Sequence, residues 1–174
     1  KGEKQISGGR VGESAAERLS RCLLALGLQL GRLKTGTTPR LDARTIDWDA
    51  IEKQEDTILG QFSFSPRNRT LSQVDCHITY TNPKTHSIIK AGLDRSPLFT
   101  GQIVGRGPRY CPSIEDKVVR FEERPRHLLF LEPEGLNTHR VYVNGLSTSL
   151  PEEIQLQMIQ SIRGLENANV LQYG

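Results

Sequence analysis

Residues 14–39 read SAAERLSRCLLALGLQLGRLKTGTTP, and this stretch contains the clearest fold signal in the chain. Apolar side chains recur at helical spacing through residues 15–26, which predicts an amphipathic helix with Cys22 on its buried face. Residues 28–34 then alternate as a strand does, and the polar turn 35–39 follows. A helix, a strand and a turn in this order are half of an α/β unit, so we predict an α/β fold for the first part of the chain.

The second half of the chain carries separate strand and helix signals. Strands are predicted over 76–81, 128–131 and 141–143, and the last two are close enough in sequence for an antiparallel hairpin. Helices are predicted over 48–54, 85–93 and 152–162. Two Ser-x-x-Glu spacings, Ser14–Glu17 and Ser149–Glu152, predict capping boxes, and Asp47 is a predicted cap for the short helix after it. These signals indicate α+β for the second half.

Residues 107–121 read GPRYCPSIEDKVVRF, which is the strongest chemical signal in the sequence. Cys111 follows Arg109 and precedes Lys117, and cations near a thiol stabilise the thiolate that a nucleophilic cysteine needs. Prolines on both sides present the thiol on a stiff, non-helical turn, and Ser113 with Asp116 can cap a short helix after it. The alternative is a surface loop with a buried, inert thiol. The density of unusual residues favours a reactive cysteine.

Composition narrows the class of protein. The chain has 174 residues, 36% hydrophobic and 25% charged, and no apolar run near the roughly 18 residues of a membrane span. Its three cysteines and four histidines show neither a disulfide framework nor metal-ligand spacing. We therefore expect a reducing compartment and no metal site. Cys76 lies at the start of a predicted strand, and we expect it to contribute to packing.

Basic side chains are concentrated in one segment of a chain with net charge +3: Arg106, Arg109, Lys117, Arg120, Arg124 and Arg126. Guanidinium groups suit phosphate oxygens, so a nucleotide cofactor or an RNA backbone is a reasonable partner. The alternative is a solvated face balanced by neighbouring acidic residues. Charge alone does not decide between the two.

Sequence blocks along nearly the whole chain identify a family resemblance. Residues 107–121 resemble the signature of the flavoprotein subunit of the tRNA uridine 5-carboxymethylaminomethyl modification enzymes, the MnmG or GidA family. The other blocks run in the family's order: SGGR at 7–10, GRLKTGTTPRLDART at 31–45, FSF at 62–64, CHITYTN at 76–82, LDRSP at 93–97, FLEPEGL at 130–136 and NGLSTSLP at 144–151.

The resemblance implies an enzyme that holds FAD and uses NADH as reductant. Such enzymes add a carboxymethylaminomethyl-type group at carbon 5 of the wobble uridine of tRNA. Methylenetetrahydrofolate supplies the one-carbon unit, and a GTPase is the partner subunit. It further implies a homodimer at full length and a cytoplasmic location in bacteria, or a mitochondrial one in eukaryotes. No membrane is implied.

The resemblance also assigns site residues. The signature cysteine is Cys111, expected to add covalently to a carbon of the uracil ring or of a one-carbon intermediate. The dinucleotide-binding stretch maps to Gly107, Pro108, Arg109, Tyr110, Cys111, Pro112, Ser113, Ile114, Glu115, Asp116, Lys117, Val118, Val119, Arg120 and Phe121, with the cations as phosphate contacts. Residues expected near the flavin are Ala16, Lys34, Thr35, Gly36, Thr37 and Arg40.

Two positions depart from the family pattern. Thr38 stands where the family commonly has proline, which frees one φ angle in the turn. Ala16 stands where the family tends to carry a serine that contacts the flavin, although the alanine N–H at a helix N-terminus remains available.

The expected organisation is part of a Rossmann-type FAD-binding domain with a smaller inserted α/β domain. Residues 1–50 are assigned to the former and 51–174 mostly to the latter, with the 107–121 loop returning to the active site. A Gly-rich dinucleotide fingerprint is absent from the sequence. We therefore expect an internal fragment of a longer flavoprotein, catalytically silent by itself. The competing hypothesis is a non-catalytic RNA- or partner-binding module that uses an Arg-rich surface.

Overall fold

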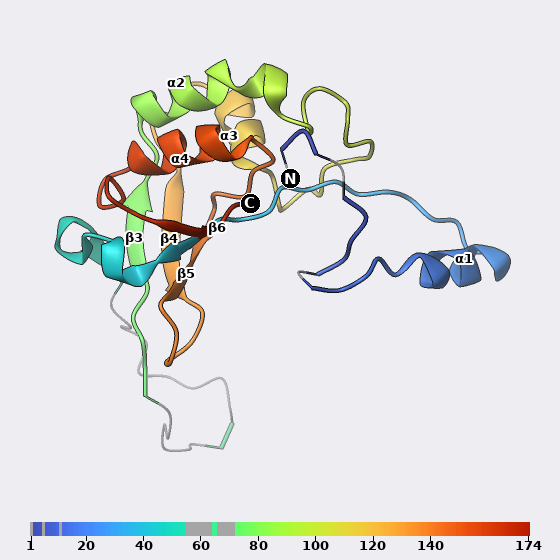
Figure 1. The fold of residues 1–174 in the computed structure, drawn as a ribbon, viewed down its shortest axis with the longest axis horizontal. Helices are drawn as coiled ribbons and strands as arrows, with labels where there is room; N and C mark the ends of the chain where they lie inside the picture. The colour runs from blue at the N-terminus through green and yellow to red at the C-terminus, as the bar shows by residue number, and fades with distance from the viewer. Residues whose placement is uncertain (1, 5, 11, 55–63, 66–71) are drawn as a thin grey trace.

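The computed structural model describes residues 2–4, 6–10, 12–54, 64–65 and 72–174. Within these ranges, helices and short strands build one antiparallel sheet and a layer of helices (Figure 1). The predicted loop at 60–72 falls almost entirely outside the described residues. The strands are β1 (Arg40–Asp42), β2 (Glu52–Lys53), β3 (His77–Tyr80), β4 (Leu128–Pro133), β5 (Arg140–Asn144) and β6 (Val170–Gln172). The helices are α1 (Glu17–Ala25), α2 (Pro83–Ala91), α3 (Ile114–Arg120) and α4 (Glu152–Gln160), with short 3-10 turns at Ala43–Thr45, Trp48–Ala50 and Leu93–Arg95.

The sheet has the strand order β2-β3-β4-β5-β1-β6, and every pair in it is antiparallel. The predicted hairpin is confirmed, since β4 pairs with β5 with Leu131 opposite Val143. Strand β1 comes from the N-terminal half but pairs with β5 on one side and β6 on the other. The sheet therefore brings the segment after residue 39 into the same core as the second half of the chain.

One face of the sheet packs against helices α2, α3 and α4 (Figure 1). Alternation along the strands decides which side chains face them: Leu129 and Leu131 of β4 are fully buried, whereas Phe130 between them is only half-buried. The core contains Leu41, Ile46, Ile89, Ile114, Val118, Leu129, Leu131, Val141, Val143, Leu146, Leu150, Met158, Ile159, Ile162, Leu165 and Ala168. The predicted combination of helices with a sheet is confirmed.

The N-terminal segment differs from the prediction in two ways. Helix α1 forms and ends before Gly27, as expected, but it lies away from the sheet and buries none of its residues (Figure 1). The predicted strand over 28–34 is wrong: that segment is extended and makes a single parallel bridge, Leu33 to Arg106. Alternating side chains indicate a strand only where a neighbouring strand offers a ladder of hydrogen bonds, and here the neighbour supplies one bridge.

Two of the predicted helix caps form and two do not. Ser113 caps α3 by accepting from the N–H of Asp116, and Asp47 caps its 3-10 turn. Both predicted capping boxes are wrong, because α1 begins after Ala16 and α4 after Pro151, each without a side-chain cap. The Ser149 hydroxyl does not bond to the N-terminus of α4. It bonds instead to the buried side chains of Glu115 and Ser96.

The 48–54 segment is also shorter in helix than predicted, because the 3-10 turn Trp48–Ala50 leads directly into strand β2. Among the described helices, none combines the length and apolar character needed to cross a bilayer.

Candidate functional site

The Cys111 loop and the 35–39 turn, separated by about seventy residues of chain, lie together. The hydroxyl of Thr35 is 3.6 Å from Sγ of Cys111. The same hydroxyl is 3.3 Å from the carbonyl oxygen of Gly36, so the thiol can donate to Thr35 while Thr35 donates to Gly36. If the thiol loses its proton, the Thr35 hydroxyl can turn and donate to sulfur. The arrangement therefore serves both protonation states of Cys111.

The turn is held by a neighbouring loop. Thr37 and Thr148 exchange two backbone hydrogen bonds, at 3.0 and 2.9 Å. Gly36 passes so close to Thr148 that a Cβ at residue 36 would lie 2.5 Å from the Thr148 nitrogen. Only glycine fits this approach, because the atoms in the way belong to backbone and cannot rotate aside. Thr38, in the place of the expected proline, is buried and its hydroxyl donates to the hydroxyl of Tyr142 at 3.3 Å.

The Cys111 loop rests on the same neighbouring loop. The backbone N–H of Ile114 donates to the carbonyl of Ser147 at 2.7 Å, and the Ser147 hydroxyl donates to the carbonyl of Pro112 at 3.4 Å. The cap at Ser113 starts α3 at this point and fixes the direction in which the chain leaves the cysteine. Cys111 itself is exposed, as predicted.

Lys117, one turn into α3, is half-buried and supplies the nearby positive charge. Its ammonium group donates to the carbonyl of Gly145 at 3.0 Å. Gly145 has φ +95°, and a Cβ there would lie 2.9 Å from the carbonyl oxygen of Leu128, so a side chain at this position would be strained. Burial lowers the pKa of Lys117, and the neighbouring Cys111 opposes this shift by favouring the charged ammonium.

Two hollows flank the turn and share Thr35, Gly36, Thr37 and Arg40. The first, of about 340 Å³, contains the thiol and is also lined by Thr38, Tyr110, Cys111, Pro112, Lys117, Tyr142, Asn144, Gly145 and Ser147. The second, of about 410 Å³, is also lined by Gly2, Gly9, Arg10, Pro97, Ile103, Thr148, Ser149, Gln172, Tyr173 and Gly174. The turn therefore has one hollow on its thiol side and another towards the N-terminal segment.

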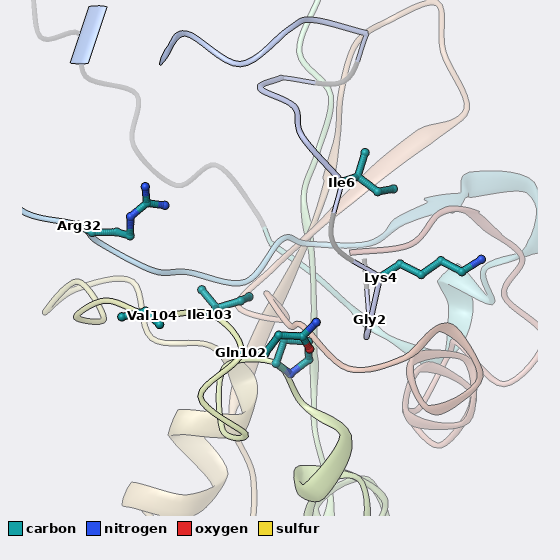
Figure 2. A pocket seen from close by; sticks show the side chains of 8 residues that line it. Gly2, Lys4, Ile6, Arg32, Gln102, Ile103 and Val104 are labelled. Carbon is teal, nitrogen blue, oxygen red and sulfur yellow. The ribbon is translucent and has the colours of Figure 1, made fainter. Parts of the chain in front are cut away.

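A larger hollow, of about 520 Å³, lies next to the second one and contains none of the predicted site residues. Figure 2 shows it between the N-terminal segment and the loop that carries Gln102, Ile103 and Val104. Its cations, Lys4 and Arg32, lie at opposite ends and do not converge on a common point (Figure 2). The smaller hollow, which contains Cys111 and Lys117, is therefore the better candidate for the functional site.

The remaining predicted residues have distinct surroundings. Arg109 and Arg120 are exposed, with Arg109 stacked on the Tyr110 ring at 5.2 Å. Arg40 is committed to the protein: it donates to Glu134 at 2.7 Å and lies over the Tyr142 ring, and the pKa of Glu134 is lowered mainly by that bond. Lys34 likewise donates to the carbonyl of Leu98 at 2.8 Å.

Two expectations about cysteines need correction. Cys22 was predicted to be core but is exposed, because α1 has no partner surface in this structure. Cys76 is only partly buried, and desolvation raises the pKa of its thiol, with Glu132 and Asp75 contributing. No group of three or more potential metal ligands occurs in the part of the chain that the structure describes.

Sequence reasoning missed the role of residues 147–149. These three residues contact both the Cys111 loop and the 35–39 turn, yet their side chains are ordinary Ser and Thr. The available signal was the NGLSTSLP block itself, which carries no recognisable catalytic residue and was therefore expected only to start a helix.

Comparison with known proteins agrees with the resemblance. All 174 residues match the family model described as "Glucose inhibited division protein A". The chain is 53% identical to the tRNA uridine 5-carboxymethylaminomethyl modification enzyme MnmG of Cytophaga hutchinsonii and 55% identical to that of Zymomonas mobilis. Each alignment covers 99% of this chain and 28% of the relative, so the chain spans well under a third of these proteins.

A solved structure shows the same fold. The form I crystal structure of Aquifex aeolicus GidA superposes with a TM-score of 0.82 at 51% identity, over 98% of this chain and 30% of that protein. The family model matches every residue of this chain, its relatives are more than 50% identical, and a solved family structure superposes on it. The chain therefore belongs to the glucose inhibited division protein A family.

Proposed function

We propose that this chain forms part of a flavin-dependent enzyme that modifies carbon 5 of the wobble uridine of tRNA. The observation that supports it best is the meeting of Cys111 with Thr35, two residues that the family resemblance assigns to the thiol and flavin sides of one site. The relatives named above are tRNA uridine modification enzymes. In this proposal Cys111 is the nucleophile.

The chemistry uses the electrophilic carbon 6 of uracil. The Cys111 thiolate forms a sulfur–carbon bond there, and the electron pair of the 5,6 double bond moves toward the carbonyl at carbon 4, which makes carbon 5 nucleophilic. Carbon 5 then bonds to the methylene carbon of the donor, and a carbon–nitrogen bond of the donor breaks with its electron pair going to nitrogen. Loss of the proton from carbon 5 and departure of the thiolate restore the double bond. Lys117, held at the Gly145 carbonyl, lines the same hollow as Cys111 and brings a cationic side chain to this side of the turn.

The second hollow offers groups that suit a flavin. Thr35, Gly36 and Thr37 contribute hydroxyls and backbone, and Arg10 contributes a guanidinium that suits phosphate or carbonyl oxygens. We therefore place FAD on this side of the turn and uracil on the Cys111 side; Ala16 and Lys34, which the resemblance puts near the flavin, do not line this hollow. Bound FAD would supply the redox step, with NADH as the source of hydride.

The exposed residues around Cys111 suit a nucleic acid. The Tyr110 ring is 86% exposed and adjacent to the thiol, and a base can stack on such a ring. Arg109, which stacks on Tyr110, and Arg120, which pairs with Asp116 at 3.5 Å, are both exposed and can reach phosphates of tRNA or NADH, whereas the Lys117 ammonium is half-buried against the Gly145 carbonyl. We therefore move Lys117 from the phosphate contacts to the thiol.

The rest of the proposal follows the family resemblance. It includes methylenetetrahydrofolate as one-carbon donor, a GTPase partner, a homodimer at full length and a cytoplasmic location. It also includes the division of the chain at about residue 50 between an FAD-binding and an inserted domain, although β1, before that boundary, pairs with β5 and β6 of the sheet.

Cys111→Ser in the full-length enzyme tests the nucleophile. Serine is close in size and the side chain is exposed, so the flavin spectrum and the melting temperature should stay nearly unchanged while tRNA modification disappears. Cys22→Ser is the matched control, because Cys22 is also exposed but lies on α1. Normal modification by the Cys111 variant would contradict the assignment.

The competing hypothesis, an RNA-binding module without catalysis, has weaker support. Arg124 lies over the Phe121 ring and Arg126 over the Tyr80 ring, so part of the basic segment is stacked on the protein itself. The ultraviolet-visible spectrum of the full-length protein separates the two. A flavin band bleached by NADH supports the enzyme, and a colourless protein that binds RNA supports the module.

A further inference from the structure

The segment Ser147–Ser149, here named the clamp, contacts both halves of the candidate site. On one side it bonds to Ile114 and Pro112 of the Cys111 loop, and on the other its Thr148 pairs with Thr37 of the turn. The 3.6 Å distance between Thr35 and Cys111 therefore depends on the clamp's holding both loops at once.

A buried carboxylate holds the clamp. Glu115, the second residue of α3, has 0% exposure, and its Oε1 accepts from the backbone N–H of Ser149 at 2.9 Å. The hydroxyls of Ser149 and Ser96 lie 3.3 and 3.2 Å from the same oxygen. The other oxygen, Oε2, is buried and has no hydrogen-bond partner among the described residues. Within the described residues, the ion pairs leave Glu115 without a basic partner.

This arrangement is costly for a group that only fills space. A buried carboxyl group with one oxygen unpaired gives up hydrogen bonds to water, and an apolar side chain of similar size would pack at lower cost. What the carboxylate provides, and an apolar side chain cannot, is an acceptor on which several donors of the clamp converge. The useful property of Glu115 is therefore its hydrogen bonding to Ser149 and Ser96.

We propose that Glu115 is a positioning residue for Cys111: by holding Ser149 it fixes the clamp, and through the clamp it keeps Thr35 beside the Cys111 thiol. The inference rests on the proposed function only in taking Cys111 as the reacting group. Glu115 does not touch substrate in this scheme and acts through Ser149, Thr148 and Thr37.

A double-mutant cycle in the full-length enzyme tests the proposal, with two readouts: the rate of Cys111 alkylation by iodoacetamide at pH 7, and kcat and KM for tRNA. Thr35→Val removes the hydroxyl beside the thiol, and Glu115→Ala releases the clamp. Each is expected to slow alkylation and kcat about fivefold, with KM within about twofold. The double variant should be at most about twofold slower than the slower single variant, because both changes remove the same contact.

Glu115→Gln is the conservative variant. Its amide oxygen can accept the bonds that Oε1 accepts now, so alkylation and kcat should stay within about twofold of the original enzyme. If Glu115→Ala does not fold, Glu115→Asp replaces it in the same cycle, since the shorter side chain withdraws the carboxylate from Ser149.

Thr79→Val is the matched structural control. The Thr79 hydroxyl is buried and donates to the carbonyl of Arg163 at 2.9 Å, with no contact to the clamp. Its loss should lower the melting temperature and leave Cys111 alkylation unchanged. The positioning role is overturned if the Glu115 variant alkylates at the original rate, if the two single effects multiply in the double variant, or if Gln is as slow as Ala.

The cycle does not depend on the modification chemistry. If Cys111→Ser retained activity, the proposed function would fail, yet the alkylation data would still show whether Glu115 sets the surroundings of the thiol.

Discussion

Helices α1 and α4 each contain nine residues, but their surroundings are opposite. Helix α4 buries Gln155, Met158 and Ile159 against the sheet and the neighbouring helices. Helix α1 buries nothing, and its Leu19 and Leu24 are 62% and 56% exposed. The apolar pattern of α1 was read correctly as a helix, yet the pattern says only which face could be buried. A surface that covers that face has to come from elsewhere.

The comparison extends to the site. The thiol side of the candidate site is built on the sheet and its helical layer, named the body here (residues 40–54 and 72–174). The other side includes the N-terminal segment (the described residues up to 39), which is joined to the body by scattered contacts such as the two Thr37–Thr148 bonds, the Lys34 bond to the Leu98 carbonyl and the ion pair of Glu3 with Arg95. The two regions should therefore respond differently to substitution.

The largest expected difference is in stability. Ile159→Ala on α4 removes a fully buried side chain and should lower the free energy of unfolding by about 2–5 kcal/mol. Leu24→Ala on α1 should change it by less than about 0.5 kcal/mol, since alanine is a better helix former and little burial is lost. Urea denaturation of this chain, followed by the fluorescence of its single tryptophan, Trp48, measures both.

Equal costs for the two substitutions would mean that α1 packs against a surface in solution, and the contrast between the regions would then be lost. A large effect at Ile159 alone would confirm that the sheet and its helices form the folding core.

The second prediction compares an exposed thiol from each region. Exposure alone predicts equal alkylation of Cys22 and Cys111. Because Lys117 and Thr35 lie at Cys111, we expect Cys111 to react about tenfold faster at pH 7. Lys117→Met should narrow the gap to roughly threefold. Peptide mapping after brief alkylation gives both rates, and a faster reaction at Cys22 would remove the case for a special environment at Cys111.

Local signals predicted much of the body from sequence. Strands β3, β4 and β5, the hairpin, the Ser113 cap and the exposure of Cys111 were all expected. Each depends on alternation, turn residues or a side chain bonding within a few positions, and these are properties of a short window of sequence.

The failures share a different cause. The predicted strand over 28–34, the buried Cys22 and the Ser149 capping box each depended on a partner distant in sequence. Ser149 shows this clearly: its spacing to Glu152 fits a helix cap, but the carboxylate of Glu115 competes for it from across the core. The clamp could not be predicted for the same reason, because its bonds are made by backbone groups that every residue possesses.

Histidines also distinguish the two regions, since all four lie in the body and none in the N-terminal segment. His86 and His127 pack with ring centroids 5.2 Å apart. The hydroxyl of Thr81 accepts from the backbone N–H of His127, which leaves its own hydrogen for Nε2 of His86 at 2.7 Å. A neutral His86 with a lone pair on Nε2 can accept this hydrogen, so the contact is compatible with an uncharged ring.

The smallest expected effect is the pH dependence of the body. Burial lowers the pKa of both His86 and His127, and Lys90 and His86 add to the shift at the two rings respectively. The unfolded chain, with histidine near its ordinary pKa of about 6.5, then binds more protons than the folded one, so stability falls as pH drops from about 7 through 6. We expect the melting temperature followed by Trp48 fluorescence to fall by about 2–4 °C over that interval.

His86→Gln should reduce the pH dependence of the melting temperature, because glutamine can still accept from Thr81 without titrating. The helical signal of α1, which contains no histidine, should not change with pH over the same interval. A melting temperature of the body that is flat with pH would show that the buried rings are solvated, and a slope that persists in His86→Gln would assign the remaining pH dependence to His127 and to His77, whose pKa burial also lowers.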